Sequence, residues 1–209
     1  MRKGIVACIG MMIGLVLLVV SFLGPWYLVN ASGVLGGDYT MEMFLAHMDF
    51  QGSFGGQDIS MSVDYADAKT SMQSTDVNME SFATIETAMY MMLLAMVTSA
   101  LSIICMVAFV FNKGKPKTMK GLGGLFAILT FVLTIIPALY FMNTEFVEDS
   151  SGFWFSYSGF GMTISGGPGY AWYLVIVVVI IAAICAAAIL VKKITPQAVA
   201  ENVASPTNT

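Results

Sequence analysis

Four long runs of apolar residues dominate this 209-residue chain, and each is long enough to cross a lipid bilayer as a helix. Polar residues do not recur within the runs every third or fourth position, as they do in a soluble amphipathic helix. The composition agrees, because 57% of the residues are hydrophobic and only 11% are charged. The pattern predicts an integral membrane α-helical protein, a bundle of four transmembrane helices forming one domain over residues 1–209, with helices at about 5–24, 83–111, 121–142 and 170–191.

The segments between the runs differ in charge, and this difference predicts the topology. We expect a first outer loop at 25–82, a second outer loop at 143–169 and a flexible cytoplasmic tail at 194–209. Cytoplasmic segments hold the excess of Lys and Arg. Apart from Lys69, the bases lie before the first run, between the second and third, or just after the fourth: Arg2, Lys3, Lys113, Lys115, Lys117, Lys120, Lys192 and Lys193. The chain is therefore expected in the cell membrane, with both termini cytoplasmic and the large loops outside.

The first apolar run has two interpretations. A cleaved signal peptide would use the small residues near Asn30 as its cleavage point. Two features favour a retained helix instead. The run is longer than the about 7–15 residues of a signal-peptide core, and Pro25-Trp26-Tyr27 suits a helix that leaves the membrane at headgroup level.

Both outer loops carry the period-two alternation of β-strands. Ile59, Met61 and Val63 alternate with serines and aspartates, which is typical of a half-buried strand. Residues 39–46 alternate less cleanly, the glycines within 52–56 predict a turn between these two strands, and 26–29 can supply a further strand. Neither loop has enough apolar surface to fold alone, since an isolated hairpin is marginal in water. We therefore expect one small extracytoplasmic antiparallel sheet built from both loops.

The second outer loop is aromatic, and it predicts a contact surface. Alternation continues through residues 153–158 and again through 160–165, as in a hairpin or one bent strand. It places Trp154 on the face opposite Phe153 and Phe155, so one of these faces must meet lipid headgroups or a partner protein. Aromatic anchors are common in protein interfaces and in bilayer interfaces, and both roles stay open. Residues expected as interfacial anchors at the outer helix ends are Trp26, Tyr27, Trp172 and Tyr173.

Two short motifs indicate packing and modification. Gly10 and Gly14 form a GxxxG spacing, which lets helix backbones approach closely. Asn30-Ala31-Ser32 is a glycosylation sequon on the expected outer side. The alternative for each motif is chance occurrence, because glycine is common in membrane helices and sequons are short.

The chain carries no recognisable catalytic, cofactor or metal motif. The three cysteines, Cys8, Cys105 and Cys185, lie inside apolar runs, so they offer neither a paired redox site nor a disulfide framework in the outer loops. His47 is the only histidine, and the acids of the first loop follow no calcium-loop spacing. We expect no enzyme activity, no cofactor and no metal. An acidic outer face also excludes nucleic acid as a partner.

At the level of architecture the chain resembles the claudin and peripheral-myelin-protein superfamily. The resemblance covers four helices, a first outer loop of about fifty residues, a shorter second loop and strands in both. Locally it is carried by Gly24-Pro25-Trp26-Tyr27, where members of the superfamily commonly have a tryptophan after the first helix. The Gly-Leu-Trp signature and the cysteine pair of claudins are absent from the first loop. The resemblance implies an outer sheet on a four-helix bundle.

These observations favour a non-catalytic tetraspan protein. Its partners would be the lipid bilayer and other membrane proteins or further copies of itself, contacted through the outer sheet. The alternative is an accessory subunit of a channel, transporter or membrane enzyme complex, as some members of the resembled superfamily are. The small residues in the apolar runs motivate this alternative, because they can pack against foreign helices.

Overall fold

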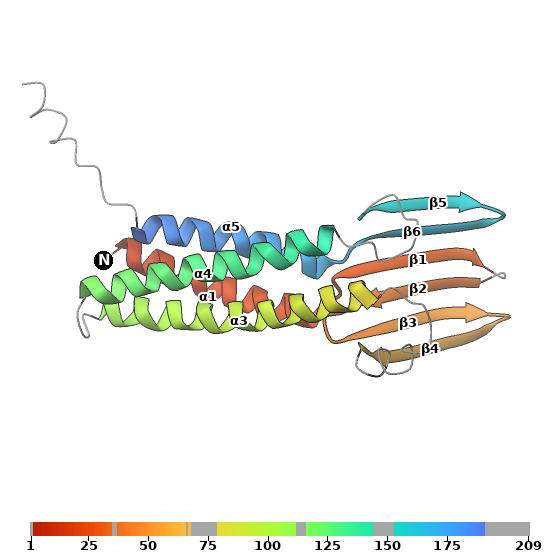
Figure 1. Cartoon of the computed structure of the whole chain (residues 1–209), viewed down its shortest axis with the longest axis horizontal. Coiled ribbons are helices and arrows are strands. Elements are labelled where there is room, and N and C mark those ends of the chain that lie inside the picture. Colours follow the sequence, from red (N-terminus) through yellow and green to blue (C-terminus); the bar gives the residue numbers. More distant parts are fainter. Residues whose placement is uncertain are drawn as a thin grey trace, which may run out of the picture.

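Four helices in the described part of the chain are long and apolar enough to cross a membrane. The computed structural model describes residues 2–34, 37–65, 67, 79–111, 116–143 and 153–190, so the tail expected at 194–209 lies outside it. The helices lie side by side in a bundle (Figure 1), and each packs against two others, so that they close a ring. Their bounds are α1 Arg2–Leu23, α3 Met79–Val110, α4 Pro116–Met142 and α5 Tyr170–Leu190.

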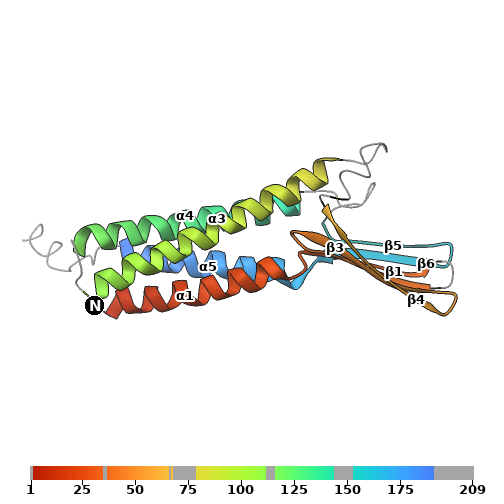
Figure 2. The same ribbon diagram turned by 90° about the horizontal axis from the view of Figure 1, so that it is seen from below.

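Two helices begin earlier than the apolar runs indicate. Helix α4 starts at Pro116, because proline is tolerated at the first helical position, where its missing N–H has no partner anyway. Helix α3 has 32 residues and spans about 48 Å at 1.5 Å per residue. That exceeds a hydrocarbon core of about 30 Å, and Figure 2 shows α3 reaching past the sheet-side ends of its neighbours.

Six strands from both loops form one antiparallel sheet beyond one end of the bundle (Figures 1 and 2). The order β4-β3-β2-β1-β6-β5 joins the loops through the pairing of β1 with β6. This confirms that both loops contribute to a single antiparallel sheet. The bounds are β1 Tyr27–Val34, β2 Gly37–Met43, β3 His47–Phe54, β4 Gln57–Asp64, β5 Phe155–Gly159 and β6 Met162–Pro168.

The strand prediction for the first loop was wrong about β3. Gly52 was assigned to a turn, whereas it lies inside β3 opposite Tyr39 and Ile59. An alternating signal was present, because Met48, Phe50 and Phe54 alternate with polar residues. The turn itself is Gly55-Gly56, and both glycines have positive φ, which two-residue hairpin connections of the primed type require.

The hydrophobic core runs without a break from the bundle into the sheet. One cluster joins buried side chains of the helices, such as Ile85 and Phe141, with Met43 and Met48 of the sheet. A second, smaller cluster lies at the opposite end of the bundle around Met11, Met106 and Ile189. Because the large cluster crosses the junction, the sheet packs on the helix ends rather than hanging from flexible linkers.

The two glycines of the GxxxG spacing both lie on the side of α1 that faces α5, but their surroundings differ. A Cβ at Gly10 would come within 2.6 Å of Cys185 Sγ, which is closer than real contacts allow. A Cβ at Gly14 would lie 3.7 Å from Ile181, at ordinary van der Waals distance. Close helix approach therefore requires glycine at position 10 and only a small residue at position 14.

We predict that Gly10→Ala lowers the free energy of unfolding in mild detergent by about 1–3 kcal/mol, the usual cost of overpacking. Gly14→Ala is the matched control and should leave stability unchanged or raise it slightly, because alanine favours helix. Adding Cys185→Ala to Gly10→Ala removes the clashing sulfur and should restore most of the loss. Equal effects of the two glycine substitutions would contradict this assignment of the α1–α5 contact.

Candidate functional site

The junction between the bundle and the sheet is built from short connections. Only three residues separate α1 from β1, and only Gly169 separates β6 from α5. The Gly169 N–H donates to the Trp26 carbonyl (2.8 Å), and the Trp26 N–H donates to the Met43 carbonyl (2.7 Å). A Cβ at Gly169 would meet the Pro25 carbonyl, so only glycine permits this close approach of the two backbones. The sheet is thereby held at a fixed angle to the helices.

Aromatic side chains fill this junction. Trp26 is fully buried; its indole N–H donates to the Ser21 carbonyl (3.0 Å), and its ring packs edge-on against Phe141. The Tyr27 hydroxyl donates to the Phe153 carbonyl (3.0 Å), which links the first loop to the second. Burial raises the pKa of Tyr27 to about 12, because the apolar surroundings disfavour the phenolate.

These positions change the interpretation of the expected interfacial anchors. Trp26, Tyr27 and Trp172 are buried, and the Trp172 indole N–H donates to the Ala138 carbonyl (3.0 Å). Their rings therefore pack inside the protein, whereas interfacial anchors were expected to present their rings to the lipid headgroups. Tyr173 is half exposed and is the one residue of the four that presents its ring at the surface. The sequence placed these residues at the helix ends but carried no signal that Phe141 of α4 and Phe153 of the second loop would pack against their rings.

The strand register gives the sheet one apolar face and one polar face, because directly paired residues point to the same side. The polar face carries hydroxyl, amide and carboxylate side chains: Asn30, Ser32, Asp38, Thr40, Glu42, Asp49, Gln51, Asp58, Ser60, Ser62, Asp64, Ser156, Ser158, Thr163 and Ser165. The apolar face carries Tyr27, Val29, Met41, Met43, Met48, Phe50, Ile59, Met61, Val63, Phe155, Tyr157 and Ile164.

Only half of the apolar face is covered. Close to the bundle, Met43 and Met48 are buried in the large core cluster. Farther along the strands, Ile59, Met61 and Tyr157 are 50%, 54% and 52% exposed. An apolar sheet face normally packs on another layer. The uncovered half is therefore the natural candidate for a contact surface, since exposed apolar patches mark interaction sites.

The second loop divides its three expected contact residues between core and surface. Phe153, expected as a partner contact, is buried in the junction and does not present its ring at the surface. The Trp154 ring lies over Gly167, and the Phe155 ring lies over Gly166. Because these glycines are consecutive in β6, the two rings lie on opposite faces of the sheet. Trp154 remains 52% exposed and also contacts the ring of Trp172, with ring centroids 6.1 Å apart. Trp154 thus lies at the junction end of the sheet, beside the first turn of α5.

Phe160 is the residue that sequence reasoning missed. It was expected within an alternating strand, but it lies in the turn between β5 and β6, at the distal end of the sheet (Figure 1). It is 97% exposed and has a φ of 52°, in the left-handed region that bulky residues avoid. The equivalent turn position between β3 and β4 is Gly55. Phenylalanine thus occupies a strained position where its side chain has little contact with the fold.

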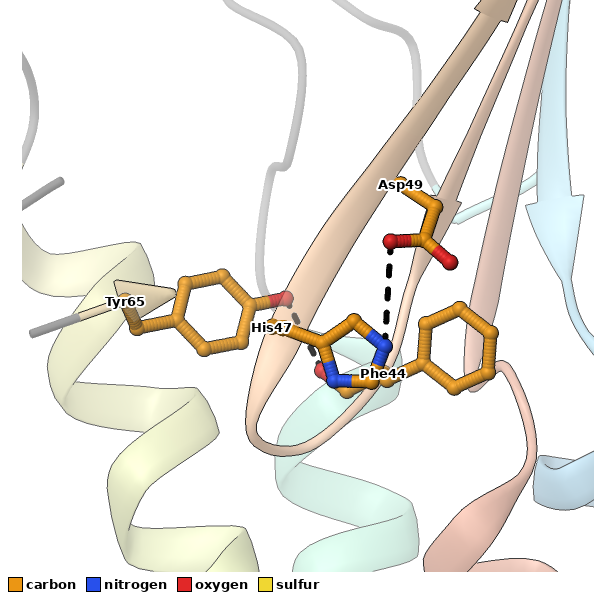
Figure 3. A network of polar contacts seen from close by, with 4 residues as sticks. All are labelled: Phe44, His47, Asp49 and Tyr65. Atoms are coloured by element: carbon orange, nitrogen blue, oxygen red, sulfur yellow. Dashed lines mark hydrogen bonds and ion pairs between the residues drawn. The ribbon is translucent and has the colours of Figure 1, made fainter. Parts of the chain in front are cut away.

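The junction end of the polar face holds the only histidine (Figure 3). His47 Nε2 lies 3.8 Å from Asp49 Oδ1, and its ring stacks on Phe44 with centroids 4.4 Å apart. The Tyr65 hydroxyl donates to the Phe44 carbonyl (2.8 Å) and fixes the turn between β2 and β3. The described residues include no group of three or more His, Cys, Asp or Glu side chains placed to hold a metal ion. This cluster shapes a turn.

The remaining polar motifs lie apart. Asn30 is exposed in the central strand β1, and its side-chain carbonyl accepts a hydrogen bond from the Thr40 hydroxyl (3.1 Å). The cysteines Cys8, Cys105 and Cys185 are free thiols in three different helices. Neither the helices nor the sheet, as far as they are described, bring these groups together.

Comparison of the chain with models of known protein families gives no match, and comparison with curated proteins gives none either. A functional proposal must therefore rest on the geometry of the sheet.

We predict that the buried Tyr27 hydroxyl makes the fold sensitive to alkaline pH. Its pKa is raised from 10.0 to about 12 in the folded chain, so the neutral form stabilises the fold fully below pH 10. That contribution is lost as the pH rises from 10 to 12. Denaturant unfolding in mild detergent at pH 9 to 12 should show a smaller loss of stability for Tyr27→Phe than for the unmodified chain. Tyr157→Phe, an exposed change on the same face, is the control and should not alter the pH dependence.

Proposed function

We propose that this chain is a multi-pass protein of the cell membrane that acts through contacts of an extracytoplasmic sheet and catalyses no reaction. Four membrane-length apolar helices support the membrane location. In the sequence, lysines precede α4 and follow α5, and Figure 1 shows the start of α4 and the end of α5 at the bundle end opposite the sheet. This supports cytoplasmic termini and an outer sheet. The architecture is also the one implied by the resemblance to the claudin superfamily.

The position of Phe160 is the observation that carries the contact function. A φ in the left-handed region costs a non-glycine residue roughly 1–3 kcal/mol. The folded chain recovers little of this cost, because the side chain is 97% exposed. Such outliers gather at ligand clamps and binding sites. Phe160 lies at the far end of the sheet, where it would be the first side chain to reach a neighbouring protein in the same membrane or an opposing surface.

Trp154 lies at the junction end of the sheet and is therefore separate from this distal contact. Its ring continues the series Trp172 and Tyr173 along the outer end of α5 (ring centroids 6.1 and 5.3 Å apart). We propose that Trp154 and Tyr173 lie at headgroup level, where amphipathic rings are favoured. The bilayer and other membrane proteins, or further copies of this chain, are then the partners.

One observation favours the alternative of an accessory subunit. Ala183 and Ala187 of α5 are exposed and lie one helical turn apart, with Ile184 beside them. Small residues at this spacing let a foreign helix approach closely within a membrane. A channel, transporter or membrane enzyme complex would then hold the chain through α5. A fixed partner of unrelated sequence, lost on Ala183→Leu and kept on Phe160→Asn, would favour this alternative.

We predict that tags at Met1 and Thr209 are both protected from protease in sealed, right-side-out cells, because the flanking lysines retain both ends in the cytoplasm. A protease site placed at Gly55-Gly56, in the distal turn, should be cleaved under the same conditions. A cleaved C-terminal tag contradicts the topology. Loss of the N-terminal tag alone would indicate a cleaved or reoriented first helix.

We predict that Phe160→Asn reduces capture of the natural complex at least about 10-fold in mild detergent, as expected for an aromatic hot spot. Stability should be kept or raised by about 1 kcal/mol, because asparagine tolerates the left-handed conformation. Gly55→Asn places asparagine at the equivalent position of the turn between β3 and β4 and should leave the complex intact. Trp154→Ser should keep the complex but weaken membrane anchoring. Survival of every complex in the Phe160 variant contradicts the contact function.

A further inference from the structure

The two edges of the sheet are protected differently. Edge strands expose unpaired N–H and C=O groups, and proteins usually shorten them, bend them with bulges or place Lys and Pro on them. Strand β5 has five residues, whereas β4 has eight and pairs with β3 over its full length without a register shift. Strand β4 contains neither lysine nor proline, and every residue except Val63 is exposed. None of the described residues pairs with the outer side of β4, so this edge can accept a further strand.

The side chains on the two faces of β4 determine which side chains an added strand must have. On the apolar face, Ile59 and Met61 are half exposed, and an added strand would place apolar side chains beside them. On the polar face, Asp58 and Asp64 lie at the two ends of the strand. Glu42 and Asp49 add carboxylates on the strands behind it, and the six described strands contain no lysine or arginine. Opposite charges in directly paired positions stabilise a sheet, and like charges destabilise it.

A second copy of this chain fits the edge poorly. Antiparallel self-pairing over all eight residues would place Gln57 opposite Asp64 and thus Ile59 opposite Ser62, so apolar side chains of one copy would join the polar face of the other. A shift centred on Met61 restores the faces but brings Asp58 of each copy opposite Asp64 of the other, which pairs like charges twice. A shift centred on Ser60 restores the faces and pairs Ile59 with Met61, but it leaves the aspartates of both copies without a base. A basic strand of another protein therefore complements the edge better than a second copy does.

We propose that β4 binds an extended segment of another protein, in which bases six positions apart enclose alternating apolar residues. The bases pair with Asp58 and Asp64, and the apolar residues extend the surface of Ile59 and Met61. Main-chain hydrogen bonds give affinity and the side-chain pattern gives specificity, as in other cases of strand addition. This inference rests on the proposed function, because the partner must reach a sheet outside the membrane.

The direct test uses a peptide with the core Lys-Val-Thr-Val-Thr-Val-Lys and the full chain in mild detergent. A matched peptide replaces both lysines with glutamate. The lysine peptide should bind at least about 10-fold more tightly than the glutamate peptide, and added salt should reduce this preference. Two further peptides carry N-methyl groups on alternate residues, one at the odd and one at the even positions. One of them should lose binding and the other should keep it, because only one edge of the peptide pairs with β4.

A charge exchange on the protein assigns the site. The double variant Asp58→Lys, Asp64→Lys should reverse the preference, so that the glutamate peptide binds more tightly than the lysine peptide. A misfolded protein would not gain affinity for the glutamate peptide. Asp38→Lys changes an exposed acid on the same face but on the inner strand β2, and should leave the preference within about 2-fold. Equal binding of both peptides, no binding of either, an equal effect of Asp38→Lys, or unchanged binding of both N-methylated peptides each overturns the proposal.

Failure of this inference is distinguishable from failure of the proposed function. A Phe160-dependent complex together with an inactive lysine peptide would reject the β4 site alone. A sheet on the protected side of the membrane would reject the contact function itself, even if the lysine peptide binds the detergent-solubilised chain.

Discussion

The pairing of β1 with β6 is the constraint on which the rest of the structure depends. These strands continue directly from α1 and into α5, and they are the only strands of the described sheet that join the two loops. Their six residue pairs fix the angle between sheet and bundle, because the Gly169 N–H donates a hydrogen bond to the Trp26 carbonyl at the base of the ladder. The other four strands add outward from this central pair. Without it, the second loop would be left with the two-stranded hairpin of β5 and β6, which is marginal in water.

The helices and the existence of one sheet could be predicted, because both follow from local pattern. Apolar runs of membrane length mark the helices, and the alternation around Met61 marks a strand whatever its partner is. The fate of individual aromatic residues could not be predicted in this way. Trp26 lies at a helix end in the sequence, and the packing of its ring against Phe141 of α4 turns an expected lipid contact into a buried one. Burial at a junction depends on contacts between residues more than 100 positions apart.

The sequence identified the aromatic loop of the candidate site but not the positions of its individual residues. The second loop was recognised as aromatic, but Phe153, Trp154 and Phe160 have three separate positions: core, junction surface and distal turn. Period-two alternation does not show where one strand ends and the next begins. Here the boundary is Phe160-Gly161, a pair that fits the period on either side. Its left-handed backbone reveals the turn, and φ is a property of the folded chain alone.

A rigid sheet with an uncovered apolar end has a physical consequence for recognition. Association costs less free energy when the contacting side chains are already ordered, since fewer rotamers and loops are immobilised. The short connections at Gly169 and at Gly24-Pro25, together with the aromatic core of the junction, order the sheet before any partner arrives. The apolar positions at Ile59, Met61 and Tyr157 then keep a fixed spacing along the strands. Specificity in such a surface comes from the polar residues between them, and in β4 those residues are serines bounded by two aspartates.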